Sequence, residues 1–179
     1  GGGSALEHQN SHVGIYTPLI VGSVLFPSIT AHEMIHAWNV KRLRPADMVP
    51  YRYSQPQPTT WLWVSEGITD YYADVVLARA GIIDTAGFTL LTNGKMEETA
   101  ATPPVALEDA SLSTWIHPAD GTGYIYYQKG SLAGLLLGGN GLADRFGRRR
   151  VFLLGLMGFA VTSVLAAIAA TVGELIAAR

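Results

Sequence analysis

Two histidines four residues apart, His32 and His36, constrain the fold of this 179-residue chain more than any other feature. They frame the string His-Glu-Met-Ile-His in an apolar-periodic segment that starts near Pro27 and stops before Pro45. Four residues advance a helix by slightly more than one turn, so both imidazoles project from one face and can converge on one cation. The pattern predicts a helix over residues 25–43 that carries two metal ligands.

Glu33 completes the HExxH pattern between these histidines. A zinc ion with two nitrogen ligands still needs a third protein ligand and an open position for water. A carboxylate beside the pair can deprotonate that water as it attacks a carbonyl group. The chain has no cysteine, which excludes thiolate zinc sites, disulfides and cysteine nucleophiles. The third ligand is therefore expected to be a histidine or an acid.

Glu66 is the candidate for that third ligand. It lies in a second apolar-periodic segment, residues 61–80, and a carboxylate there makes a His₂Glu zinc site. Asp70 follows one helical turn later and is expected to accept the other ring N–H of His32, which would fix the orientation of the ring. An ordinary solvated acid is the alternative interpretation of Asp70, and also of Asp74.

The remaining elements are predicted from local patterns. Gly81 is expected to close the second helix in the left-handed conformation, and a third helix is predicted over 124–137. Short strands are expected near residues 12–19, where β-branched and aromatic side chains gather. Loops are predicted over 50–58 and from residue 93 to about 123. Together these patterns indicate an α+β fold that is mainly helical.

The charge distribution divides the chain after residue 137. Residues 138–179 hold five of the 12 basic residues but two of the 14 acids, and residues 151–173 carry no charge. An uncharged stretch of this length is enough to span a bilayer as a helix. The basic residues at 145–150 predict a cytoplasmic location for that flank and for everything before it. A buried hairpin of core helices is the alternative.

The net charge of −2 makes nucleic acid an unexpected partner.

Three segments of the chain resemble the glycyl-aminopeptidase-type zinc metallopeptidases, relatives of aminopeptidase N in the gluzincin clan. They are HEMIHAWNVKRLRP (His32 to Pro45), WVSEGITDYYADVVLARAG (Trp63 to Gly81) and YYQKGSLAGLLL (Tyr126 to Leu137). The resemblance implies a thermolysin-like α+β catalytic fold, of which residues 1–137 are a part. It also implies one Zn²⁺ per chain, held by His32, His36 and Glu66, with Glu33 as the general base.

The resemblance implies two further roles. Tyr127 matches the family's tyrosine that hydrogen-bonds the developing oxyanion, and Tyr126 is the alternative. The segment Ser4 to Ser11 resembles the family's Gly-Gly-Leu-Glu-His strand, in which Glu7 would face the α-ammonium group of the substrate. A free amine pairs with such a carboxylate whereas an internal amide does not, so the implied substrate is a peptide with a free N-terminus.

Residues 138–179 depart from that family. Residues 141–150 look like a cytoplasmic loop of the major facilitator superfamily of transporters, followed by the apolar helix. The leading hypothesis is a zinc-dependent aminopeptidase that uses metal-activated water. The second is a membrane-anchored or transporter-derived fusion fragment with a catalytically silent peptidase remnant, in contact with lipid through 151–173. The third is a zinc-stabilised peptide-binding module. We expect a membrane-associated protein, or a soluble one if the tail is an artefact.

Overall fold

The computed structural model describes residues 3–114 and 121–139. The chain divides into two compact units, Gly1–Leu137 and Gly138–Arg179. The predicted Arg-rich loop and the predicted membrane span over 151–173 lie outside the described residues. Within the described part, no helix has both the length and the apolar character needed to cross a membrane.

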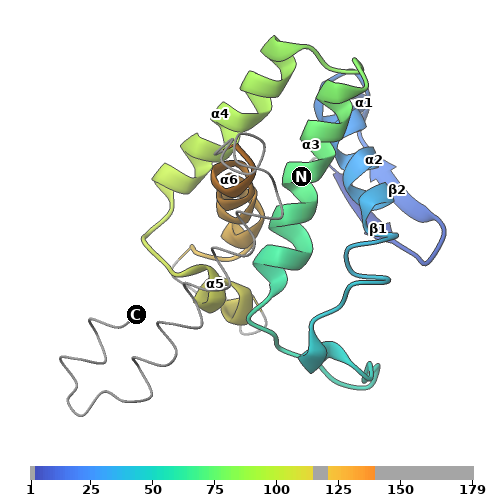
Figure 1. Cartoon of the computed structure of the whole chain (residues 1–179), viewed down its shortest axis with the longest axis vertical. Coiled ribbons are helices and arrows are strands. Elements are labelled where there is room, and N and C mark those ends of the chain that lie inside the picture. The colour runs from blue at the N-terminus through green and yellow to red at the C-terminus, as the bar shows by residue number, and fades with distance from the viewer. Residues whose placement is uncertain (1–2, 115–120, 140–179) are drawn as a thin grey trace, which may run out of the picture. The chain divides into compact units, whose positions relative to one another are not determined.

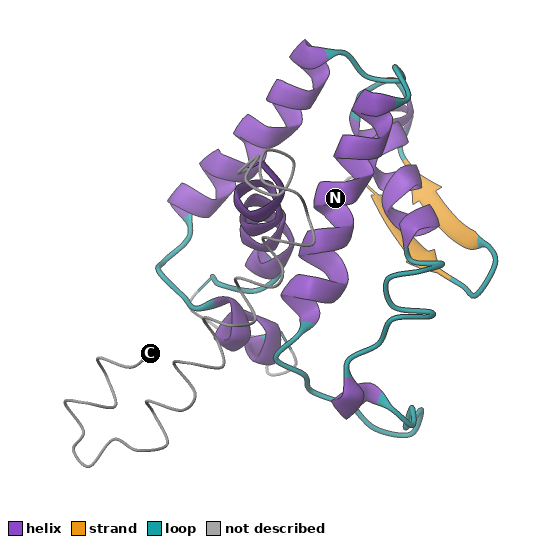
Figure 2. Ribbon diagram, in the orientation of Figure 1, coloured by secondary structure: helices purple, strands orange, loops and turns teal. Residues whose placement is uncertain are grey.

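The described chain consists of one β-hairpin followed by helices, as the predicted α+β class requires (Figure 2). The strands are β1 (Gly3–Glu7) and β2 (His12–Tyr16). The helical segments are α1 (Pro18–Val21), α2 (Leu25–Ile35), η1 (Ala46–Met48), η2 (Trp63–Ile68), α3 (Thr69–Arg79), α4 (Thr85–Ala101), α5 (Leu107–Ser113) and α6 (Ile125–Gly139).

The hairpin lies against α2. Its strands pair antiparallel with Glu7 opposite His12, so Glu7 stands at the turn end of β1. The second strand is rich in β-branched and aromatic residues, which favour extended chain, and it lies where the sequence predicted a strand. Both strands touch α2, which brings the end of β1 close to the helix that carries HExxH (Figure 1).

α2 ends at Ile35, well short of the predicted boundary at Leu43. Two local features stop the helix. The Nδ1 atom of His36 hydrogen-bonds to the Asn39 carbonyl oxygen (2.7 Å), which competes with helical hydrogen bonding. Val40 then adopts a φ of 141°, which lies outside the helical region. The chain therefore turns directly after the second histidine.

The predicted helix over 61–80 contains two kinds of turn. η2 is a π-helical segment, and α3 continues from it as an α-helix. π-helical turns are rare and are often found at functional sites. Glu66 lies in η2, so the wide turns set its position. Gly81 has a φ of 70°, which confirms the predicted left-handed C-terminal cap.

The loop predicted from residue 93 to about 123 is wrong in part, because it contains the second half of α4 and all of α5. Asp84 caps α4 by accepting a hydrogen bond from the Gly87 N–H (2.8 Å). Leu91 of α4 is buried in the core. The cap and this packing outweigh the weak helix propensity of Thr92, Asn93 and Gly94. The third predicted helix is present as α6.

The main core lies between α2, α3 and α4. Small buried residues, Ala31 of α2 and Ala73 of α3, let these two helices approach closely, and Leu77, Ile83 and Leu91 fill the space beside them. α3 lies between α2 on one side and α4 and α6 on the other (Figure 1). The histidine ligands are therefore placed by α2, and Glu66 by η2, which α3 continues against the same core.

Candidate metal centre

α2 and η2 bring the three predicted metal ligands together. The Nε2 atoms of His32 and His36 lie 2.9 Å apart. The Glu66 Oε2 atom lies 3.1 Å from the first and 3.3 Å from the second. Both histidines are buried; His32 lies in the last turn of α2, and His36 is the residue that caps its C-terminal end. The three donor atoms form a compact triangle.

The size of this triangle fits one divalent cation. Ligand atoms about 2.0–2.1 Å from a tetrahedral zinc ion are roughly 3.3 Å from one another. The observed edges of 2.9, 3.1 and 3.3 Å approach that separation. Two histidine nitrogens and one carboxylate are also a donor set that zinc accepts. The residues present therefore fit the metal that the sequence predicts.

The outer nitrogens of both rings are already engaged. His36 Nδ1 lies 2.7 Å from the Asn39 carbonyl oxygen, which only accepts, so this nitrogen carries a proton. His32 Nδ1 lies 2.9 Å from Asp70 Oδ1, where it donates to the carboxylate. In the neutral rings both Nε2 atoms present lone pairs toward each other and toward the Glu66 carboxylate. Three acceptors that face one another need a shared positive charge, either a proton or a metal ion.

The pKa values of the site reflect this need. Burial alone would lower the pKa of His32, but its hydrogen bonds to Asp70 and Glu66 outweigh burial and raise the pKa to about 10. Burial alone would raise the pKa of Glu66, but its hydrogen bonds to both histidines lower the pKa to about 2. These shifts favour a proton on the His32 imidazole and an ionised Glu66 carboxylate.

Glu33 is buried beside the triangle. Its Oε2 atom has no hydrogen-bond partner among the described residues. Burial raises the pKa of this carboxyl group, and the neighbouring His32 and His36 limit the rise. A buried carboxylate oxygen without a partner is costly unless a polar group occupies the space that it faces. The unpaired oxygen and the raised pKa are properties that a general base requires.

α6 contributes Tyr127 to the site. Its side chain lines the same cleft as Glu66, and its ring centroid lies 5.9 Å from that of His32. Burial, and then the negative charge of Glu66, raise the pKa of this phenol above its ordinary value, so the phenol keeps its proton. Tyr126, the alternative candidate, packs instead in a buried cluster with Leu62.

The candidate ligands line a cleft of about 440 Å³, and β1 forms part of its wall. Glu7 approaches Glu33 and His36, so that one ligand atom from each lies within 4.8 Å of the others. The Glu7 Oε1 atom also lies 3.0 Å from Lys41 Nζ. The sequence did not predict this ion pair, because Glu7 and Lys41 are 34 residues apart and no local pattern joins them.

Two further residues support the ligands and were not predicted. The side-chain amide of Asn39 donates to the Val64 carbonyl oxygen (2.8 Å) and to Thr69 Oγ1 (2.9 Å), which ties the end of α2 to η2 and α3. Lys95 of α4 lies 3.2 Å from Asp70 Oδ2. Asn39 lies inside one of the family-like strings, whereas nothing in the local pattern distinguishes Lys95 from a solvated lysine.

Comparison with known proteins places this geometry in a family. Residues 26–133 match the profile of the M61 glycyl aminopeptidase family. The crystal structure of an aminopeptidase N family protein from Idiomarina loihiensis is similar, with a TM-score of 0.63 and 28% sequence identity. That match covers 75% of this chain and 26% of the other, so this chain spans about a quarter of that relative. No match is found among curated proteins.

Neither match supports the predicted resemblance of residues 138–179 to a transporter segment. The predicted relationship to the glycyl-aminopeptidase-type peptidases is confirmed over residues 26–133. That match spans more than half of the chain and includes the ligand triangle, Glu33 and Tyr127. The chain belongs to the M61 glycyl aminopeptidase family.

Proposed function

We propose that this chain is the zinc-binding catalytic part of an aminopeptidase, which hydrolyses the first peptide bond of a peptide with a free N-terminus. One observation carries the proposal. The donor atoms of His32, His36 and Glu66 lie 2.9–3.3 Å apart and line the same cleft as Glu33, whose Oε2 atom has no hydrogen-bond partner in the described part of the chain. Membership of a peptidase family supports this chemistry.

His32, His36 and Glu66 would hold the zinc ion. When bound there, zinc polarises the scissile carbonyl group and makes a water molecule acidic near neutral pH. The acceptors on the outer ring nitrogens, Asp70 and the Asn39 carbonyl group, keep both imidazoles turned toward the cleft. Neither ring has to rotate before it presents its Nε2 atom.

Glu33 acts as the proton carrier. Its carboxylate accepts a proton from the attacking water as the water oxygen bonds to the carbonyl carbon. The carbon–nitrogen bond then breaks, and Glu33 gives the proton to the departing amine. Burial makes this carboxylate a stronger base than an exposed one, because burial raises its pKa.

Tyr127 and Glu7 act on opposite charges of the substrate. The Tyr127 hydroxyl group donates a hydrogen bond to the oxyanion that forms from the carbonyl oxygen. The Glu7 carboxylate accepts the α-ammonium group at the other end of the reacting residue. Since Lys41 already pairs with one Glu7 oxygen, the ammonium group must share this carboxylate or displace Lys41.

The substitution Glu33→Gln tests the proposal on N-terminal glycyl and alanyl amide substrates. We expect hydrolysis to fall by roughly 10²–10⁴-fold, because the general base is lost, while the chain retains about one zinc ion. Glu97→Gln is the matched control, since Glu97 is an exposed acid of α4, and it should leave the rate unchanged.

The outcome also separates the alternatives. Activity that survives Glu33→Gln removes Glu33 from the mechanism. A zinc-loaded chain that cleaves none of the substrates favours a silent remnant or a zinc-stabilised binding module. Equal cleavage of free and N-acetylated substrates would remove the requirement for a free N-terminus, and with it the proposed role of Glu7.

Membrane attachment through residues 151–173, with residues 1–137 on the cytoplasmic side, stays a prediction from the sequence. Carbonate extraction of membranes from cells that express the full chain tests it. Retention of the chain in the membrane pellet supports the span, and release into the supernatant supports a soluble protein.

A further inference from the structure

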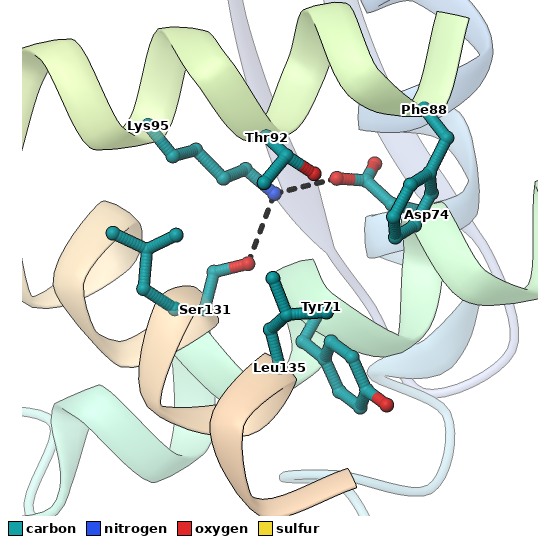
Figure 3. Close-up of a pocket in the computed structure, with 8 residues that line it drawn as sticks. Tyr71, Asp74, Phe88, Thr92, Lys95, Ser131 and Leu135 are labelled. Carbon is teal, nitrogen blue, oxygen red and sulfur yellow. Dashed lines mark hydrogen bonds and ion pairs between the residues drawn. The ribbon is translucent and has the colours of Figure 1, made fainter. Parts of the chain in front are cut away.

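Lys95 of α4 occupies a partly buried polar position that the proposed reaction does not use. Its side chain is 12% exposed. Its Nζ atom lies 2.6 Å from Asp74 Oδ2 and 3.0 Å from Ser131 Oγ (Figure 3). The cavity beside it has a volume of only about 10 Å³, which is at the lower limit for one water molecule. The position is therefore too small for a ligand, and any role of Lys95 must pass through its protein partners.

One of those partners leads to the candidate metal centre. The Lys95 Nζ atom lies 3.2 Å from Asp70 Oδ2. The other oxygen of the same carboxylate, Asp70 Oδ1, lies 2.9 Å from His32 Nδ1. The two oxygens of Asp70 thus have separate partners, one in α4 and one in α2.

This division of partners fixes a carboxylate that could otherwise rotate. Rotation about the Cβ–Cγ bond of Asp70 would move Oδ1 away from the His32 ring, and the contact of Oδ2 with Lys95 opposes that rotation. A hydrogen-bonded acceptor on a ligating histidine sets the orientation of its ring. Holding Asp70 therefore holds the His32 Nε2 atom toward His36 and Glu66.

The ion pair with Asp74 does not replace the contact of Lys95 with Asp70, because the Lys95 ammonium group makes both. The two oxygens of Asp74 already have partners, Ser28 Oγ at 2.7 Å and Lys95 Nζ at 2.6 Å. These bonds tie α2, α3 and α4 together and anchor the Lys95 ammonium group. From this anchored position the same ammonium group also reaches Asp70.

We propose that Lys95 is a positioning residue of the metal centre, which raises zinc affinity by holding Asp70 against His32. The inference rests on the proposed zinc site. It extends the support of that site to a third helix, α4, which the family-like strings do not include.

The test measures the zinc dissociation constant of the full chain by competition with a chromophoric chelator. We expect Lys95→Met to weaken zinc binding by about tenfold, the lower end of what the loss of an outer hydrogen-bonding partner costs. The direction of the change in zinc affinity is informative. By Coulomb's law, the loss of a positive charge near a cation site would by itself strengthen zinc binding. Weaker binding therefore reports lost positioning.

A double-mutant cycle with Asp70→Asn identifies the route. If Lys95 acts through Asp70, Lys95→Met should cause no further loss of zinc affinity in a chain that already carries Asp70→Asn. Ser131→Ala is the control, because it removes a hydrogen bond to Lys95 without touching Asp70. We expect it to change the dissociation constant by less than about twofold.

Unchanged or tighter zinc binding in Lys95→Met overturns the inference, and so does an equal loss in the Asp70→Asn background. If Lys95→Met does not fold, Lys95→Leu, which also removes the ammonium group and every N–H donor of the side chain, is measured against the same criteria. Failure of the zinc site itself looks different, since the unsubstituted chain would then bind no zinc or would bind it equally well after His32→Ala.

Discussion

At the scale of single residues, the site contains an un-ionised phenol, Tyr127, close to an ionised carboxylate, Glu66. Tyr127 keeps its proton because burial and the charge of Glu66 both raise its pKa. The pKa of Glu66 is lowered to about 2, since hydrogen bonds from two histidines outweigh its burial. The hydroxyl group is therefore a hydrogen-bond donor at every pH at which the chain is expected to work, and it lies beside the candidate metal ligands.

Tyr127→Phe tests the role of this donor. We expect kcat to fall by roughly 10²–10³-fold with little change in KM, because the hydroxyl group contributes mainly when the oxyanion forms. Steady-state kinetics on an alanyl amide substrate measures both constants, and metal analysis should still find zinc. A similar loss in Tyr126→Phe, with Tyr127→Phe unaffected, would transfer the role to the neighbouring tyrosine.

At the scale of the elements, two glycines set the distance between α6 and η2. A Cβ atom on Gly67 would lie 2.6 Å from the Cα atom of Gly130, and one on Gly130 would lie 2.8 Å from the Trp63 carbonyl oxygen. Neither position has room for a side chain. This close backbone approach brings Tyr127 of α6 near Glu66 of η2. The glycines of the Ser-Glu-Gly and Tyr-Gln-Lys-Gly strings allow it because they have no side chain.

Gly67→Ala is therefore expected to separate the two elements. We expect the free energy of unfolding to fall by about 1–3 kcal/mol, the usual cost of forcing a methyl group into a packed interface. Urea denaturation measures this loss. Gly94→Ala is the matched control, because Gly94 is exposed in α4 and a Cβ atom there meets nothing within 4 Å. This control should raise the free energy of unfolding by about 0.5–1 kcal/mol, because alanine has a higher helix propensity than glycine. Equal stability of Gly67→Ala and the original chain would contradict the packing interpretation.

The sequence predicts those features that depend on residues close together along the chain. The i, i+4 spacing of His32 and His36 fixes their common face through helix geometry alone. The bonds from Asn39 that tie the end of α2 to η2 and α3 join segments that lie far apart along the chain. The support from Lys95 likewise depends on how α4 packs against α3. Such interactions join segments whose relative position no local pattern sets.

At the scale of the whole molecule, the candidate centre links metal binding to folding. Its donors come from α2 and η2, and their supports come from α3, α4 and α6, so unfolding would separate every ligand from its partners. Zinc that binds the folded chain but not the unfolded chain must stabilise the fold. The free energy of unfolding rises by about 2.7 kcal/mol when the free zinc concentration is one hundred times the dissociation constant. We expect urea midpoints to rise with zinc concentration, and His32→Ala to abolish that rise.

The stabilisation by zinc should increase with pH. The ordinary pKa of His32 is 6.5 and its folded value is about 10, so proton binding there stabilises the metal-free chain fully below pH 6.5 and is lost as the pH rises through 10. Zinc must displace this proton, and displacement becomes easier as the pH rises. The difference between the urea midpoints with and without buffered zinc should therefore be larger at pH 8.5 than at pH 6.5. Equal differences at the two pH values would mean that zinc does not compete for the His32 proton, and the ligand assignment at His32 would then be wrong.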